Sequence, residues 1–138
     1  MNQKAMDFNA YIRNVKDFPK SGIVFKDITP LLKDKEAMTA AVDTLYGFAR
    51  TDKIDKVVGV DSRGFIFAPL LAYKLGVGFV PVRKKGKLPS ATLSEEAVCK
   101  LAEKLGGEIV QCNLIIHLSF LKGAEKLIGY PVKALLEY

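Results

Sequence analysis

Two clusters of charged residues and glycine in this 138-residue chain have the composition of anion-binding loops. The first is Asp61-Ser62-Arg63-Gly64, which follows the apolar run Lys56–Val60. Its glycine permits a tight turn, a following helix would offer free N–H groups, and Arg63 adds a forked cation. A capped turn with a solvent-facing arginine explains the segment as well, and Asp61 fits a helix cap at least as readily as a general base.

The second cluster is Arg83-Lys84-Lys85-Gly86-Lys87-Leu88-Pro89, directly after the apolar run 77–82. Its cations could surround a diphosphate, and a solvated basic turn accounts for them equally well when this segment is considered alone. Ligands of open parallel sheets bind at the carboxyl ends of the strands. Two such loops at neighbouring strand ends therefore favour a shared site for a polyanion.

A third candidate is Gly22–Asp27, where main-chain groups lie beside the ring of Phe25, as recognition of a planar heterocycle requires. Core packing of Val24 and Phe25 is the alternative. His117 lies within an apolar run, and we interpret it as a core histidine rather than a catalytic one.

Hydrophobic periodicity predicts the elements that would position these clusters. Strands alternate with helices, which indicates an α/β fold with a mostly parallel sheet flanked by helices, in a single domain spanning 1–138. We expect helices at 1–17, 34–48 with Asp34 as N-cap, 65–75, 94–105 and 123–128, and strands at 23–25, 56–60, 77–82, 108–118 and 132–136.

Composition narrows the class of protein. Hydrophobic residues make up 49% and charged residues 26%, as in ordinary globular proteins, and no apolar run approaches the roughly 18 residues of a membrane span. The N-terminus lacks the apolar core of a signal peptide, so we expect a cytoplasmic protein. Cys99 and Cys112 form no CxxC pair and are expected to be buried, reduced thiols without a metal. The net charge of +6 permits nucleic-acid binding, an anionic small substrate or a solvated basic surface, and a recognition helix or aromatic–basic stripe for nucleic acid is lacking.

Several motifs, taken in order, resemble the adenine phosphoribosyltransferases. Phe18-Pro19-x-x-Gly22-Ile23-x-Phe25-Lys26-Asp27-Ile28-Thr29-Pro30-Leu31-Leu32 is similar to the N-terminal signature of that family. Val60–Phe67 resembles its pyrophosphate loop, and Arg83–Pro89 followed by Thr92 resembles its basic loop. Leu105-Gly106-Gly107 and Leu121–Leu127 are similar to its C-terminal third.

The resemblance implies a type I phosphoribosyltransferase fold and transfer of ribose 5-phosphate from phosphoribosyl pyrophosphate to adenine, giving AMP and pyrophosphate. It implies Mg²⁺ bound mainly through the substrate, with no protein side chain as metal ligand, and a cytoplasmic homodimer. By the same resemblance, Val24 and Lys26 read the adenine edge through main-chain groups and Phe25 packs on the base. Arg63, Lys84 and Lys87 are expected to face the pyrophosphate and to be the catalytic cations, and Asp61 and Ser62 of the same loop are expected to bind substrate.

The chain departs from the family pattern between Glu96 and Ala97. Members of the family carry there a flexible hood and an apolar strand that ends in two aspartates, followed by a Thr/Gly-rich turn that holds the 5-phosphate. No Asp-Asp pair followed by such a turn occurs in these 138 residues. Either the polypeptide truly lacks the segment, or the sequence is an incomplete record of a longer chain. If the deletion is real, a non-catalytic protein that binds purine or pyrophosphate becomes the alternative to an enzyme.

Overall fold

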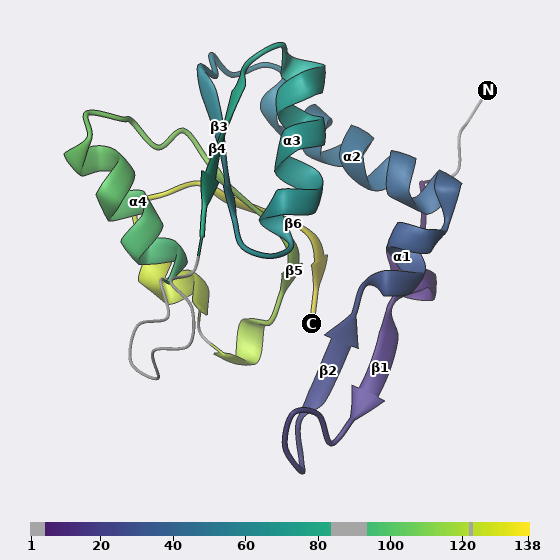
Figure 1. The fold of residues 1–138 in the computed structure, drawn as a ribbon. Coiled ribbons are helices and arrows are strands. Elements are labelled where there is room, and N and C mark those ends of the chain that lie inside the picture. The colour runs from purple at the N-terminus through teal and green to yellow at the C-terminus, as the bar shows by residue number, and fades with distance from the viewer. Residues whose placement is uncertain (1–4, 84–93, 122) are drawn as a thin grey trace. The chain divides into compact units, whose positions relative to one another are not determined.

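The computed structural model describes residues 5–83, 94–121 and 123–138, and the chain divides into two compact units, residues 1–44 and 45–138. In the first unit, the 3₁₀ helix η1 (Phe8–Tyr11) and strand β1 (Arg13–Lys16) precede strand β2 (Val24–Asp27) and helix α1 (Thr29–Lys33). β1 and β2 form an antiparallel hairpin (Figure 1). Helix α2 (Lys35–Ala49) then continues into the second unit.

The helix expected over residues 1–17 is wrong for the part that the structure describes, residues 5–17. Asp7 caps only one short turn, accepting a hydrogen bond of 3.1 Å from the Asn9 N–H, and the backbone of Ile12 is already extended. The residues that follow pair with β2, with Val15 opposite Phe25. Pairing with a strand that lies later in the chain thus overrides a weak helical pattern.

Helix α2 begins as expected, because a carboxylate oxygen of Asp34 accepts a hydrogen bond of 2.8 Å from the Ala37 N–H. This side-chain acceptor satisfies one of the N–H groups that lack a partner at the start of a helix. The helix buries a face at four-residue spacing, made of Ala37, Ala41, Leu45 and Ala49.

In the second unit, strands β3 (Lys56–Val60) and β4 (Gly78–Val82) pair in parallel, and helix α3 (Gly64–Leu75) connects them and lies alongside them (Figure 1). The predicted strands and helix are confirmed here to within a residue or two. Gly76 ends α3 in the left-handed conformation, with φ of 70°, which suits a residue without a Cβ. Phe67, Ala68, Leu71 and Ala72 form the buried side of the helix.

The opposite face of this strand pair is open among the described residues. Val58 and Val80 lie opposite each other in the parallel register, and 40% and 42% of their surfaces are exposed. Parallel strands are normally buried on both faces by helices. The pair therefore has a helix on one side and exposed valines on the other.

The rest of the second unit contains helix α4 (Glu95–Lys104), strand β5 (Cys112–His117), the 3₁₀ helices η2 (Ser119–Leu121) and η3 (Gly123–Leu127), and strand β6 (Val132–Glu137). β5 and β6 pair in parallel, beginning with Cys112 opposite Val132. The strand expected at 108–118 is shorter because residues 108–111 have no ladder partner among the described strands.

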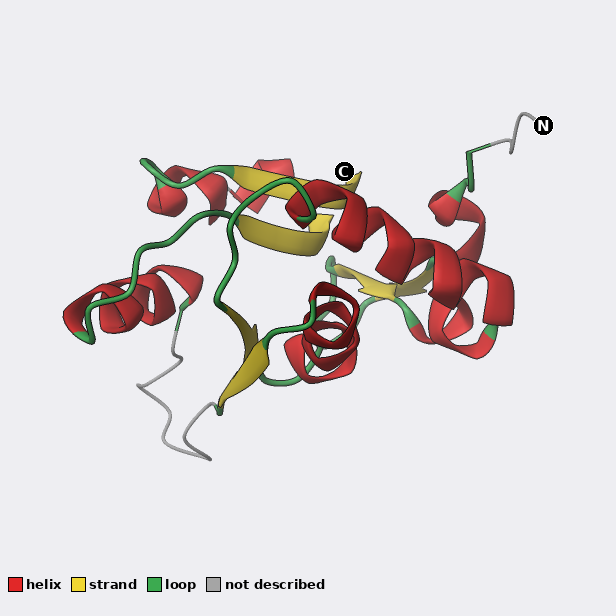
Figure 2. Ribbon diagram, turned by 90° about the horizontal axis from the view of Figure 1, so that it is seen from above, coloured by secondary structure: helices red, strands yellow, loops and turns green. Residues whose placement is uncertain are grey.

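The described strands thus form three two-stranded sheets, namely one antiparallel hairpin and two parallel pairs. Figure 2 shows the two parallel pairs of the second unit as separate ribbons. The α/β fold class with parallel strands is confirmed, although no ladder among the described residues joins the β3–β4 pair to the β5–β6 pair. In the same residues, no helix combines the length and apolar character that crossing a membrane requires.

Candidate active site

The base-reading residues predicted from the sequence, Val24, Phe25 and Lys26, all lie on strand β2 of the first unit. The Ile23 carbonyl accepts a hydrogen bond of 3.1 Å from the Phe18 N–H, so its peptide group faces the hairpin partner. Backbone direction alternates along an antiparallel strand, which directs the main-chain groups of Val24 and Lys26 to the outer edge of β2. That edge can bind a planar molecule carrying both donors and acceptors.

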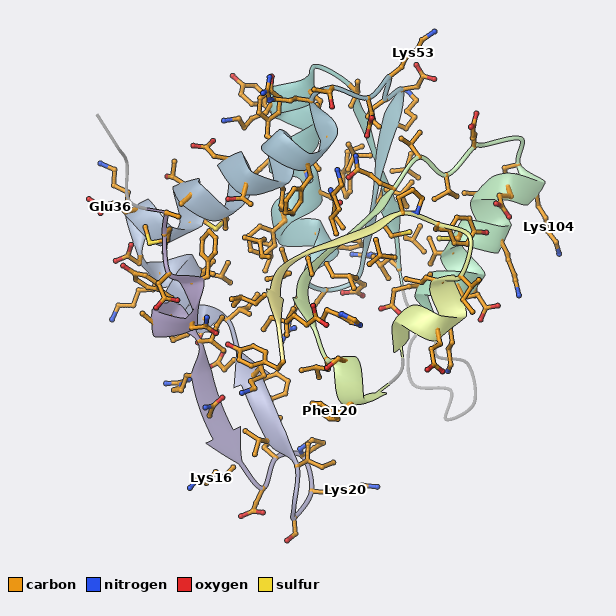
Figure 3. The ribbon with its side chains drawn as sticks, turned by 180° about the vertical axis from the view of Figure 1, so that it is seen from behind. Lys16, Lys20, Glu36, Lys53, Lys104 and Phe120 are labelled. Carbon is orange, nitrogen blue, oxygen red and sulfur yellow. The ribbon has the colours of Figure 1, made fainter. Side chains whose placement is uncertain are left out.

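Aromatic surface lies on the same hairpin. The rings of Phe18 and Phe25 meet edge to face with centroids 5.4 Å apart, and Phe18 is half exposed. Such exposed aromatic rings offer a flat apolar contact. Lys26 does not extend freely, because its Nζ donates a hydrogen bond of 2.8 Å to the Asn14 side chain on β1. Lys16 and Lys20 lie near the turn end of the hairpin (Figure 3).

The C-terminal end of β2 is fixed by Asp27, the one charged residue that is buried among those described. Its carboxylate accepts hydrogen bonds of 2.9 Å from both the N–H and the hydroxyl of Thr29, and it pairs with Arg13 on β1. The bonds from Thr29, together with those from Arg13, lower the pKa of Asp27. Sequence reasoning did not assign Arg13 and Thr29 a role, since only the hairpin register places Arg13 opposite Asp27.

The pyrophosphate residues predicted from the sequence form the turn between β3 and α3 in the second unit. Asp61 continues the ladder, donating its N–H to the Val82 carbonyl at 3.0 Å, and it is half buried. Ser62 is exposed. Arg63 is half buried and is the residue just before the helix. No acidic residue lies in the first turn of α3. A cation just before a helix whose first turn holds no carboxylate favours an anion, and the Asp61 carboxylate, two residues before Arg63, is the opposing charge in the turn.

Two glycines bring this turn close to the strand. A Cβ on Gly59 would lie 2.6 Å from the Gly64 carbonyl oxygen and 2.7 Å from the Ala68 Cβ, and one on Gly64 would lie 2.9 Å from the Gly59 carbonyl carbon. Neither position has room for a side chain. The start of α3 is therefore packed directly against the β3 backbone. This contact fixes the backbone position of Arg63, the residue just before the helix.

The remaining predicted cations, Lys84 and Lys87, lie outside the described residues. The hairpin edge belongs to the first unit and the 61–63 turn to the second. Within the described ranges, no three His, Cys, Asp or Glu side chains group closely enough to hold a metal ion.

Helix α4, which contains the Glu96–Ala97 junction, begins in a different way from α3. The Ser94 hydroxyl oxygen accepts a hydrogen bond of 3.2 Å from the Ala97 N–H, and Glu95 and Glu96 occupy the first turn. A hydrogen bond and the positive charge of Lys100 lower the pKa of Glu96. The helix runs without a break across the junction, and carboxylates stand where an anionic ligand would have to bind.

Comparison with known proteins identifies the family to which this architecture belongs. Residues 30–114 match the phosphoribosyl transferase domain family. An adenine phosphoribosyltransferase from Christiangramia forsetii is 45% identical over an alignment that covers 96% of this chain and 99% of the relative. The chain belongs to the adenine phosphoribosyltransferase family.

Solved structures agree with this assignment. The chain is similar to the crystal structure of adenine phosphoribosyltransferase from Thermoanaerobacter pseudethanolicus, with a TM-score of 0.84 and 36% identity over 95% of this chain and 98% of that one. The Saccharomyces cerevisiae enzyme, solved with adenine and an imino-altritol bisphosphate, gives a TM-score of 0.82 and 32% identity over 96% and 98% of the two chains. The type I phosphoribosyltransferase fold follows from these likenesses.

The alignment with the Christiangramia forsetii adenine phosphoribosyltransferase also bears on the length of the chain. It extends over 170 residues, whereas this chain has 138 and takes part with only 96% of them. The relative therefore carries internal residues that this chain lacks. This agrees with the departure from the family pattern noted in the sequence, which locates the difference between Glu96 and Ala97.

Proposed function

We propose that the chain carries the adenine end and the pyrophosphate end of the family's reaction, the transfer of ribose 5-phosphate from phosphoribosyl pyrophosphate to adenine. The observation that carries the proposal is the β3–α3 turn, where Gly59 and Gly64 hold Arg63 at a helix start free of first-turn carboxylates. The outer edge of β2 supports the adenine end.

At the adenine end, the main-chain groups of Val24 and Lys26 bind the edge of the base, and Phe25 with Phe18 covers its face. Main-chain donors and acceptors distinguish one base from another because a mismatched group would leave a polar atom without a partner. Asp27 acts as a positioning residue, since its bonds to Arg13 and Thr29 fix the end of the strand.

At the pyrophosphate end, Asp61, Ser62 and Arg63 form the loop around the leaving group, and Lys84 and Lys87 add two further cations. As the bond from ribose to pyrophosphate breaks, negative charge grows on the pyrophosphate and the ribose becomes oxocarbenium-like. Cations fixed in advance bind that growing charge more strongly than the ground state, which lowers the barrier.

The described residues suit a Mg²⁺ ion that is bound mainly by the phosphates of its substrate rather than enclosed by protein side chains. Mg²⁺ keeps several waters and commonly binds substrate phosphates with few protein carboxylates. Bound to the diphosphate, it supplies positive charge to the leaving group. We further propose that residues 1–138 act as a single phosphoribosyltransferase domain in a cytoplasmic homodimer that binds adenine, phosphoribosyl pyrophosphate, AMP and pyrophosphate.

A second function, binding without turnover, is favoured by the start of α4. The family's 5-phosphate turn has no counterpart in this sequence, and Glu95 and Glu96 would repel a phosphate at that helix. A chain of this kind would bind adenine or pyrophosphate and form no AMP.

Two measurements on one sample decide between the functions. Intact mass spectrometry establishes whether the polypeptide has the 15.2 kDa of this sequence or is larger. AMP formation from adenine, phosphoribosyl pyrophosphate and Mg²⁺ is then measured on the chain of known mass. Turnover at 15.2 kDa establishes the enzyme. Absence of AMP at that mass, with adenine and pyrophosphate still bound in calorimetry, establishes the binding protein instead.

A further inference from the structure

The only two cysteines of the chain, 13 positions apart in sequence, meet in the second unit. Cys99 lies on α4 and Cys112 is the first residue of β5, and their sulfur atoms are 3.7 Å apart. Both are free thiols, Cys99 buried and Cys112 half buried. Neither has a part in the proposed reaction.

We propose that Cys99 and Cys112 are a site of oxidative modification, at which a small-molecule disulfide converts the two thiols into an intrachain disulfide joining α4 to β5. A disulfide has its sulfurs roughly 2.0 Å apart, so the pair must approach by less than the length of one Cβ–Sγ bond. Closure requires the two side chains to turn about their Cα–Cβ bonds until the sulfurs meet.

The reaction balances as two successive thiol–disulfide exchanges. A cysteine thiolate attacks one sulfur of oxidised glutathione, which forms a mixed disulfide and releases one glutathione thiolate that takes up a proton. The second cysteine then loses its proton, attacks the protein-side sulfur and releases the second glutathione. The two cysteines lose two electrons and two protons in total, and the glutathione disulfide gains them.

The surroundings decide which sulfur reacts first and how fast. Cys112 is the more exposed of the two and receives the oxidant. Burial, and after it the hydrogen bond and charge shared with Cys99 and the nearby Glu95, raise the pKa of Cys112. Little thiolate exists at neutral pH, so the pair reacts slowly with an oxidant. Cys99, in contact with the mixed disulfide, completes the second exchange.

Carboxylates near the pair disfavour the thiolate form of the cysteines. A hydrogen bond with Glu103 of α4 raises the pKa of Tyr130 to about 12, and the two thiols contribute to that shift. Glu95 acts on Cys112, and the Tyr130 phenol, bound to Glu103, lies close enough for the two thiols to affect its pKa. Such surroundings slow oxidation of the thiols. The dithiol–disulfide equilibrium then depends mainly on the geometry of the pair.

The experiment equilibrates the whole chain in reduced and oxidised glutathione, with and without urea. The fractions of dithiol, mixed disulfide and intrachain disulfide are read by mass spectrometry after acid quenching. The intrachain product is recognised by loss of the mass of two hydrogen atoms. The fractions give the effective concentration of one thiol in the presence of the other. We expect this effective concentration to be at least about tenfold higher in the folded chain than in urea.

Three variants complete the design. Cys99→Ser and Cys112→Ser should stop at a mixed disulfide, and the more exposed Cys112 of Cys99→Ser should acquire it sooner. Cys99→Ala/Cys112→Ala controls for other modification. An effective concentration in the folded chain no higher than in urea would overturn the proposal. So would accumulation of mixed disulfide or of disulfide-linked dimers in the folded wild-type chain.

Discussion

The second unit contains two helices whose first turns differ in charge. α3 follows the Asp61–Arg63 turn, has a cation just before the helix and has no carboxylate in its first turn. α4 starts at Ser94 with Glu95 and Glu96 in its first turn. Protein carboxylates thus lie in the first turn of α4, at the positive end of its helix dipole, and none lies in the first turn of α3. We propose that the same backbone feature serves anion binding at α3, while at α4 its carboxylates serve helix stability.

The packing behind the two helix starts differs as well. At α3 the backbone of β3 lies against Gly64 with no room for a Cβ on either side. At α4 the stabilising contacts are local, namely the Ser94 cap and the Glu96–Lys100 ion pair on the helix surface. Tight packing against β3 fixes the backbone at the start of α3, whereas a local cap stabilises the start of α4 without such a contact.

The largest expected effect comes from filling the close approach at α3. Gly59→Ala places a methyl group against the Gly64 carbonyl and the Ala68 Cβ, both of which are held by backbone. We expect the free energy of unfolding to fall by about 3 kcal/mol, measured by urea denaturation. Gly47→Ala, at an exposed position of α2 with nothing within 4 Å, is the matched control and should raise stability by roughly 0.5–1 kcal/mol. Equal effects of the two substitutions on the free energy of unfolding would show that the backbone at this turn shifts at little cost to accept the methyl group.

The next effect is on binding at the same turn. Arg63→Ala removes the forked cation before α3, and we expect pyrophosphate to bind roughly 10- to 100-fold more weakly, measured by calorimetry. Arg50→Ala, which removes an exposed arginine elsewhere in the unit, controls for the change in net charge. In an active chain, the same variant should lower kcat and raise the KM for phosphoribosyl pyrophosphate. Unchanged affinity would remove Arg63 from the site.

The comparison between the helices is tested directly by removing the charges at α4. Glu95→Gln/Glu96→Gln should leave pyrophosphate affinity unchanged, because we place no anion at that helix. A clear gain in affinity would instead mean that the start of α4 is an anion site suppressed by its own carboxylates.

A smaller effect is expected at the cap of α4. Ser94→Ala removes the acceptor for the Ala97 N–H and should cost about 1 kcal/mol of stability. Ser94→Asp keeps a side-chain acceptor at the same position and is the matched control, for which we expect little loss. If the two variants are equally stable, the helix does not depend on this cap.

The sequence predicts the second unit better than the first. Strand 56–60, the helix after it and its end at Gly76 follow from short apolar runs and a glycine, and these are local signals. The predicted N-terminal helix was wrong because Arg13–Lys16 pair with β2, whose residues lie 8 to 14 positions further along the chain, and local periodicity contains no information on that pairing. Propensity yields to pairing in such cases.

The candidate site divides in the same way. The residue types at Val24–Lys26 and Asp61–Arg63 could be identified from the sequence, and the family resemblance supplied their expected roles. The bonds from Arg13 and Thr29 to Asp27 could not be identified, because they depend on the hairpin register. The separation of the β3–β4 and β5–β6 pairs also required the structure, since each strand taken alone resembles an ordinary buried strand.

The smallest expected effect is a pH dependence at α4. The hydrogen bond and charge of Lys100 lower the pKa of Glu96, so the folded chain binds this proton less readily than the unfolded chain. The contribution to stability is present above the ordinary pKa of about 4.5 and is lost as the pH falls through the lowered value. The difference in Tm between the wild-type chain and Glu96→Gln should therefore be visible at neutral pH and shrink below about pH 4.5.

Glu108→Gln, which alters an exposed carboxylate outside the helix, controls for net charge. A difference that stays constant down to pH 3 would show that the Glu96–Lys100 pair does not stabilise the first turn. The cap at Ser94 would then be the remaining local support for the start of α4.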